Sequence, residues 1–172
     1  NQRIRVTQRD SVVDALEFIK RGYDGAHIKE ELESNRFEST IYIMVGTLKN
    51  LRKGGRITPA VAAIGTLLKI KPVLAIHGEK LDAFANARTV SQGKSIMINA
   101  VRSDMEKLIK CTDVSKYSIN VAYSNDIEAA REFAEELKKE FGCEVGTFPL
   151  SLRVACHIGP YSLAIGVSKI PD

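Results

Sequence analysis

The sequence has no tryptophan, and aromatic residues of all kinds make up only 6% of its 172 residues. No stretch reaches the ~18 uninterrupted apolar residues that a membrane-spanning helix needs, so we expect no membrane span. The first ten residues are polar and include three arginines, which is unlike a secretory signal peptide. These absences favour a globular fold over a membrane-spanning one.

Cysteine is also scarce. Cys111, Cys143 and Cys156 are odd in number and widely spaced, whereas a disulfide scaffold needs a denser, even set and a zinc site needs close pairs. Three reduced thiols are typical of a reducing compartment. We therefore expect a cytoplasmic protein without disulfides.

Familiar catalytic and metal-binding motifs are missing as well. His, Cys, Asp and Glu show no metal-ligand spacing, and no GxSxG, GxGxxG, Walker A or paired-carboxylate motif occurs. The sequence therefore predicts no metal and no cofactor.

The length suits one domain or two unequal lobes, because domains typically have roughly 100–200 residues. The net charge of +4 is unevenly distributed. Residues 47–110 contain twelve basic and four acidic residues, a net charge of +8. A basic segment attracts anions such as nucleic acid, phosphate or a carboxylate ligand.

Hydrophobic periodicity predicts alternating helices and strands. In the helix expected at 11–21, Val12, Leu16 and Ile19 share one face. Further helices are expected at 26–34, 48–53, 59–69, 91–109 and from a cap at Asn125 to 141. Strands are expected at 40–45, 73–76, 81–89, 117–123, 143–148, 152–156 and 162–167.

This pattern predicts an α/β fold with α+β character: a mixed sheet of about six strands, with helices packed mainly on one face. Residues 1–38 form a helical lead-in, and residues 39–172 form the mixed-sheet core.

The first candidate site is the segment Lys53-Gly54-Gly55-Arg56-Ile57-Thr58-Pro59. Two glycines allow a tight turn and close backbone approach. Thr58-Pro59 is a strong helix start, which would place Arg56 near free backbone N–H groups. A guanidinium at that position suits a carboxylate or phosphate. A surface arginine after a helix cap is the alternative.

The second candidate is Cys156-His157-Ile158-Gly159-Pro160-Tyr161, where His157 follows an expected strand. A histidine there could donate a hydrogen bond to an anionic oxygen, or it could have a purely structural role. Cys156 and His157 should not act together, because neighbours in a strand point to opposite faces. A third, weaker candidate anion contact is Arg88, together with Gly93-Lys94-Ser95 at a helix start.

These segments together resemble the DegV family. The resemblance rests on Gly54-Gly55-Arg56-Ile57, then Leu67-Leu68-Lys69-Ile70-Lys71-Pro72, then Ala87-Arg88, and finally His157-x-Gly159-Pro160. The motifs occur in the family's order, and the resemblance covers residues 40–168.

The resemblance implies a bacterial, non-catalytic protein that binds a long-chain fatty acid for a partner fatty-acid kinase, which makes the acyl phosphate. Arg56 and His157 would hold the carboxylate, beside Gly55, Ile57 and Gly159. Hydroxyls of an N-terminal lobe, which has no counterpart in this chain, would complete the site. Apolar side chains that could line the acyl slot, or equally form core, are Met44, Ile64, Leu67, Leu68 and Ile158.

The final turn departs from the family pattern. The family more often has Thr after the His and Gly after the Pro, where this chain has Ile158 and Tyr161. Three alternatives to fatty-acid binding remain open from the residues alone. They are a nucleic-acid- or other anion-binding module using residues 47–110, an enzyme using Cys156 or His157, and a purely structural lobe. Few aromatics and no nucleic-acid motif make nucleic acid an unfavoured partner.

Overall fold

The computed structural model describes residues 3, 6–55, 70–77, 80–107 and 109–171. The α-helices in this part of the chain are α1 (Val6–Lys20), α2 (Gly25–Ser34), α3 (Lys49–Lys53), α5 (Val90–Lys107), α6 (Ile127–Phe141) and α7 (Leu152–Ile158). The strands are β1 (Ser39–Met44), β2 (Lys71–His77), β3 (Lys80–Ala87), β4 (Tyr117–Tyr123), β5 (Val145–Pro149) and β6 (Leu163–Lys169). The helix expected at 59–69 lies outside the described residues.

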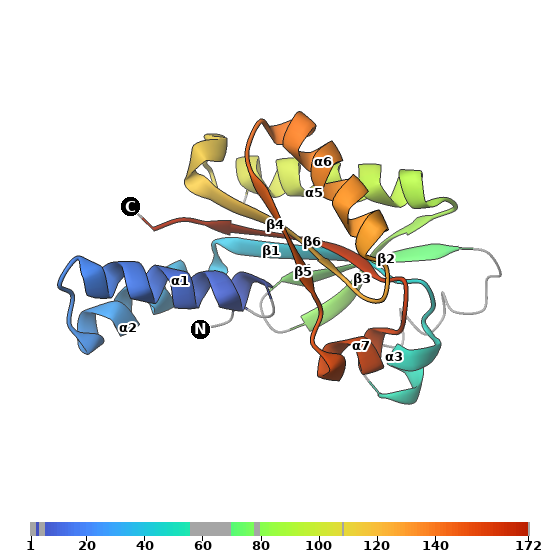
Figure 1. The fold of residues 1–172 in the computed structure, drawn as a ribbon, viewed down its shortest axis with the longest axis horizontal. Coiled ribbons are helices and arrows are strands. Elements are labelled where there is room, and N and C mark those ends of the chain that lie inside the picture. The colour runs from blue at the N-terminus through green and yellow to red at the C-terminus, as the bar shows by residue number, and fades with distance from the viewer. Residues whose placement is uncertain (1–2, 4–5, 56–69, 78–79, 108, 172) are drawn as a thin grey trace.

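The six strands form one sheet in the order β3-β2-β1-β6-β4-β5 (Figure 1). Neighbouring strands are antiparallel except β4 and β5, which are parallel and are connected through α6. The expected mixed α/β sheet is therefore confirmed.

Successive side chains of β1 lie on opposite faces of the sheet, in two separate apolar clusters. Tyr42 and Met44 join the larger cluster, which α5 and α6 cover. Ile43 and Val45 join a smaller cluster on the opposite face, together with residues of α3 and α7. Helices α5 and α6 cover one face, and α1, which is as long as α6, lies with α3 and α7 against the other (Figure 1). Helices therefore cover both faces, rather than mainly one as expected.

Helix α6 follows directly from its sequence. Its apolar stripe is buried against β4 and β5, and Gly142 ends it in the left-handed conformation. The predicted cap residue is off by one position. Asp126, not Asn125, accepts the capping hydrogen bond from the backbone N–H of Ala129, at 3.0 Å. The stop at Gly142 was expected.

The strand predicted at 152–156 is wrong, because these residues form the helix α7. Apolar side chains alternate at Leu152, Val154 and Cys156, which imitates a strand. Short apolar runs cannot be assigned by periodicity alone. Leu152 is largely exposed, so the alternation does not mark a buried face.

Helix α1 begins earlier than predicted and packs with an unusual face inward. Thr7, Asp10, Ser11 and Asp14 are buried against the sheet, with Phe18 as the apolar exception. The apolar positions Val12, Leu16 and Ile19 are all exposed. The helix therefore presents its polar face to the domain.

Candidate functional site

The Gly-Gly turn of the first candidate lies at the end of α3. Leu48 and Leu51 bury their side chains in the smaller apolar cluster, which fixes this short helix against the sheet. The helix stops at Gly54, and Gly55 follows with a φ of +61°. A left-handed conformation of this kind favours glycine. Gly55, the residue before Arg56, is thus held at the outer end of α3.

His157 lies in the last turn of α7, and α7 packs against α3. Its side chain is partly buried, and within the described residues it makes no hydrogen bond. Ile158, the next residue, is fully buried in the smaller cluster. Two of the predicted segments, far apart in the sequence, therefore come together on one face of the sheet.

Gly159 allows close contact between the two helices. Its φ of +85° is in the region that favours glycine. A Cβ atom at Gly159 would lie 2.6 Å from the side-chain nitrogen of Asn50 on α3. A side chain at this position would therefore force the Asn50 amide to move aside, in addition to straining the backbone at this φ.

Ser124 ties the turn after His157 to the end of β4. Its hydroxyl donates to the carbonyl of Gly159 at 2.7 Å and accepts from the N–H of Ser162 at 3.1 Å. Its backbone carbonyl also accepts from the N–H of Tyr161 at 3.1 Å. Neither Ser124 nor Asn50 could be identified from the sequence, because each is distant in sequence from the turn it supports.

An apolar wall adjoins α3 and α7. Its buried members come from strands and both short helices: Ile43, Val45, Leu48, Leu51, Leu74, Ala122, Ile158 and Ala164. Partly buried side chains surround them: Leu81, Ala83, Phe148, Leu150 and Val154. These side chains are packed core beneath α3 and α7, and they place an apolar surface next to the last turn of α7.

The remaining predicted site residues are placed as follows. Arg56, Ile57, Ile64, Leu67 and Leu68 lie outside the described residues. Met44 is buried on the face of the sheet opposite to α3 and α7, where its sulfur packs against Gly93 of α5. Arg88 is exposed between β3 and α5. The structure thus groups Gly55, His157, Ile158 and Gly159, and it keeps Met44 apart from them.

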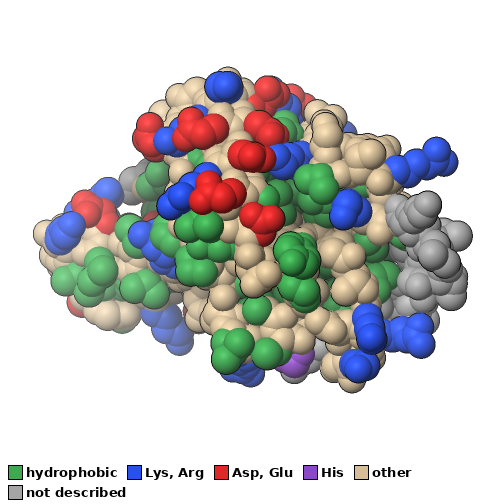
Figure 2. Space-filling model, turned by 45° about the vertical axis from the view of Figure 1, so that its right-hand side comes forward, with side chains coloured by type: hydrophobic (Ala, Val, Ile, Leu, Met, Phe, Trp, Pro, Cys, Tyr) green, Lys and Arg blue, Asp and Glu red, His purple; other side chains and the backbone are tan. Residues whose placement is uncertain are grey.

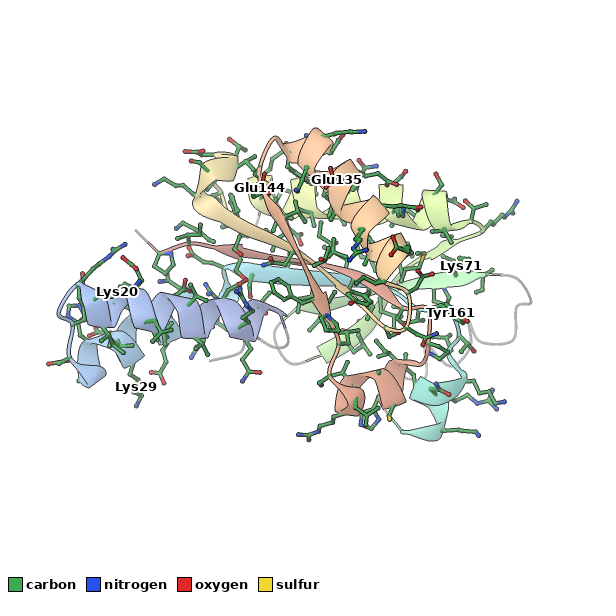
Figure 3. The ribbon with its side chains drawn as sticks, viewed as in Figure 1. Lys20, Lys29, Lys71, Glu135, Glu144 and Tyr161 are labelled. Carbon is green, nitrogen blue, oxygen red and sulfur yellow. The ribbon has the colours of Figure 1, made fainter. Side chains whose placement is uncertain are left out.

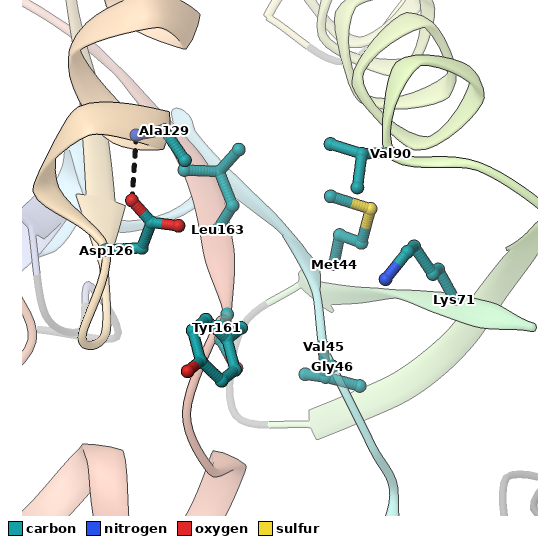
Figure 4. Close-up of a pocket in the computed structure, with 10 residues that line it drawn as sticks. Met44, Val45, Gly46, Lys71, Val90, Asp126, Ala129, Tyr161 and Leu163 are labelled. Carbon is teal, nitrogen blue, oxygen red and sulfur yellow. Dashed lines mark hydrogen bonds between the residues drawn. The ribbon is translucent and has the colours of Figure 1, made fainter.

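A separate pocket of about 260 Å³ lies where β1 ends and β6 begins (Figure 4). Met44, Val90 and Leu163 give it apolar walls, and Lys71 and Asp126 are on its rim. Figure 3 shows Lys71 and Tyr161 at this same end of the sheet. The first turn of α5 is capped by Thr89, whose hydroxyl accepts from the backbone N–H of Gln92 at 3.1 Å.

Part of the basic charge of residues 47–110 is neutralised within the fold. Lys94 pairs with Glu136 at 2.8 Å, and Arg102 pairs with Glu140, so two cations of α5 face carboxylates of α6. Figure 2 shows acidic and basic side chains interspersed over α5 and α6. Within the described ranges, no group of three or more His, Cys, Asp or Glu residues could hold a metal ion.

Cys156 and His157 both lie on the helix α7, not on the expected strand. Adjacent helical positions also point in different directions, so the two side chains are still not aligned for joint chemistry. Cys156 is a free, exposed thiol.

In the described part of the chain, no helix has the length and apolar character needed to cross a membrane.

Comparison with known proteins gives a match over nearly the whole chain. The family model described as "Uncharacterised protein, DegV family" matches residues 4–169. The chain belongs to the DegV family. A DegV domain-containing protein of Staphylococcus aureus is 31% identical over 157 residues, which are 90% of this chain and 52% of that relative. The chain therefore spans about half the length of the curated DegV relatives it matches.

Two solved DegV structures resemble this fold and are described as fatty-acid-binding. The Thermus thermophilus DegV protein has a TM-score of 0.80 and 27% identity, covering 92% of this chain and 55% of its own. Bacillus subtilis DegV has a TM-score of 0.77 and 28% identity, covering 94% of this chain and 56% of its own. The resemblance inferred from the motifs is thus confirmed at the level of the family.

Proposed function

We propose that this chain is the acyl-binding half of a DegV protein that binds a long-chain fatty acid. The packing of α3 against α7 is the observation that carries the proposal. It brings Gly55, which precedes Arg56, and His157 to the same face as an apolar wall. The fatty-acid-binding DegV structures of T. thermophilus and B. subtilis support the ligand class.

The chemistry of a fatty acid suits these residues. Each buried methylene of the acyl chain contributes ~0.8 kcal/mol, so a long chain supplies most of the affinity. A carboxylate is costly to bury unless it is paired and hydrogen-bonded. Arg56 offers a permanent cation with paired N–H donors, and His157 offers a ring N–H. Arg88, exposed between β3 and α5, is a further candidate anion contact.

The proposed role is to present the carboxylate, not to transform it. A partner fatty-acid kinase would phosphorylate the acyl group, and hydroxyls from a second lobe would complete the carboxylate site. The protein itself would need no cofactor and would act in the cytoplasm. Each of these features follows from the family resemblance.

Ligand binding is tested first on the protein as purified from bacteria. Native mass spectrometry should detect a retained mass equal to a fatty acid. A protein that carries no acyl ligand, and binds none added in calorimetry, would contradict the proposal.

The role of Arg56 is tested by Arg56→Ala, with Arg52→Ala as the matched control. Arg52 is an exposed arginine on α3, four positions earlier. Loss of a charge-assisted hydrogen bond should weaken acyl binding roughly tenfold to hundredfold in Arg56→Ala. Arg52→Ala should bind like the unaltered protein. Equal affinities in all three proteins would exclude Arg56 as the carboxylate contact.

The role of His157 is tested by His157→Ala in the kinase reaction, with the exposed His27→Ala on α2 as the control. His157→Ala should lower acyl-phosphate production, because the carboxylate is no longer held for phosphoryl transfer. His27→Ala should leave it unchanged. Unaltered production by His157→Ala would contradict the presenting role while leaving the binding result intact.

A further inference from the structure

Helix α7, which carries His157, is too short to hold that side chain in place by itself. Its seven residues are well below the ~12–15 at which an isolated helix becomes even marginally stable in water. Among the described residues, Ser151 makes no side-chain capping hydrogen bond at the first turn, and Leu152 is 80% exposed. The position of His157 therefore depends on what anchors the other end of the helix.

That anchor is Ser124, a buried residue directly after β4. Its hydroxyl donates to the carbonyl of Gly159 at 2.7 Å and accepts from the N–H of Ser162 at 3.1 Å. Its backbone adds two hydrogen bonds, from the N–H of Tyr161 at 3.1 Å and to the carbonyl of Ser162 at 3.0 Å. One residue thus binds both ends of the turn at 159–162, which follows α7.

Gly159, the residue that the Ser124 hydroxyl holds, is also where α7 meets α3. Its N–H donates to the carbonyl of Ala155 at 2.8 Å and so closes the last turn of α7. On its other side, the space that a Cβ atom would occupy is filled by the Asn50 side chain of α3. The Ser124 hydroxyl therefore acts at the contact between the two helices of the candidate site.

The turn that Ser124 holds is strained. Tyr161 has a φ of +58°, a conformation that is costly for a residue with a bulky side chain. Asn125, directly after Ser124, is also left-handed with a φ of +67°, which asparagine tolerates better. Strained conformations persist only where the surrounding structure holds them, and they cluster at binding and active sites. The strain thus indicates that the shape of this turn matters for function.

We propose that Ser124 is a positioning residue for carboxylate presentation: its hydroxyl fixes the turn at 159–162 and thereby the place of His157. This inference rests on the proposed function, in which His157 holds the carboxylate for phosphoryl transfer. A misplacement of about 1 Å can lower the rate of a positioned reaction ~100-fold. The acyl chain supplies most of the affinity, so loss of the hydroxyl affects transfer more than binding.

The test is a double-mutant cycle in the full-length polypeptide that the gene encodes, loaded with hexadecanoate and assayed with a fatty-acid kinase. It compares Ser124→Ala, His157→Ala and the double variant. Ser124→Ala should lower kcat for acyl-phosphate production roughly tenfold to hundredfold, and should lower it no further when His157 is already alanine. The affinity for hexadecanoate, measured by calorimetry, should change less than about threefold.

Thr40→Ala is the matched control for loss of a buried hydroxyl. The Thr40 hydroxyl donates to Asp104 at 2.7 Å, and Thr40 lies towards the opposite end of the sheet from Ser124. Thr40→Ala should lower the free energy of unfolding in urea, as Ser124→Ala does, but leave acyl-phosphate production unchanged. Ser124→Thr, which keeps the hydroxyl, should restore production. If Ser124→Ala does not fold, Ser124→Cys takes its place in the cycle, because a thiol keeps the bulk but is a weak donor.

Additive losses from Ser124→Ala and His157→Ala would overturn the proposal, because Ser124 would then act independently of His157. Full production by Ser124→Ala, or an equal loss in Thr40→Ala, would overturn it too. Binding of hexadecanoate by the unaltered protein is measured before any substitution. Its absence would contradict the proposed function itself, whereas normal binding with an additive cycle would contradict only the role of Ser124.

Discussion

Tyr161 adopts a backbone conformation that glycine would adopt at lower cost. Its φ is +58°, in the left-handed region, and its side chain is mostly exposed. Its N–H is held by the carbonyl of Ser124, so the turn fixes this conformation. The glycine that the DegV family more often has at this position is explained by the same geometry.

We predict that Tyr161→Gly raises the free energy of unfolding by about 0.5–1 kcal/mol. The left-handed conformation costs a non-glycine residue roughly 1–2 kcal/mol, which the greater chain entropy of glycine partly offsets. Urea unfolding measures the change. Tyr161→Ala is the control, because it keeps the Cβ atom and should give no gain. A stabilisation by alanine equal to that by glycine would show that side-chain removal is the cause.

At the scale of the element, α1 carries two buried carboxylates with opposite consequences. Burial raises the pKa of Asp10 above its ordinary value, and its Oδ2 atom has no hydrogen-bond partner among the described residues. Burial raises the pKa of Asp14 as well, but the Arg3 guanidinium, 2.7 Å away, opposes that shift and is itself neutralised by Asp14. One carboxylate is therefore a cost to the fold at neutral pH, and the other balances a charge.

We predict that Asp10→Asn is at least as stable as the unaltered chain at pH 7, whereas Asp14→Asn loses roughly 3 kcal/mol because it removes the carboxylate that the buried Arg3 guanidinium contacts at 2.7 Å. Asparagine can still accept the hydrogen bond from Ser118. Urea unfolding measures the free energy of unfolding of each protein, at pH 7 and on acidification.

The pH dependence of the free energy of unfolding tests whether ionised Asp10 is a cost to the fold. A raised folded-state pKa means that the folded chain holds the Asp10 proton more tightly than the unfolded chain. The stability associated with that proton is present in acid and is lost as the pH rises through the folded-state pKa. The advantage of Asp10→Asn should therefore be largest at pH 7 and shrink on acidification towards pH ~4. An advantage that grows on acidification would contradict the raised pKa.

Local patterns predicted most elements, and the exceptions have physical causes. The expected strand at 117–123 matches β4, and the capped, amphipathic α6 ends at Gly142 as expected. The α7 segment was misassigned because a seven-residue helix is too short to show a helical period. The inward polar face of α1 depends on Ser118 and Asn120, more than a hundred residues away. The candidate site was found by motif, whereas Asn50 and Ser124 become visible only when α3, α7 and β4 are assembled.

At the scale of the whole molecule, the net charge of +4 is a weak indication of nucleic-acid binding. Two cations of the basic segment, Lys94 and Arg102, are already paired with carboxylates of α6. The charge that remains available for phosphate contacts is correspondingly smaller.

We predict that the chain binds a short DNA duplex no more tightly than the non-specific range of roughly 10⁻⁴–10⁻⁶ M at physiological salt. Fluorescence anisotropy over a salt series measures both the affinity and its salt dependence. Charge-reversed Glu136→Lys, which adds a cation beside Lys94, should bind more tightly than the unaltered chain. Sub-micromolar binding with a steep salt dependence would restore the nucleic-acid alternative.

The position of β6 has a consequence for biosynthesis. This strand, at residues 163–169, lies in the middle of the sheet and, among the strands that the structure describes, is the one that joins β1–β3 to β4 and β5. The two parts of the sheet cannot be connected on the ribosome until residue 169 has left the exit tunnel. A nascent chain stalled before β6 would expose two open strand edges, which are templates for aggregation. Sheet closure is thus coupled to nearly complete translation of this segment.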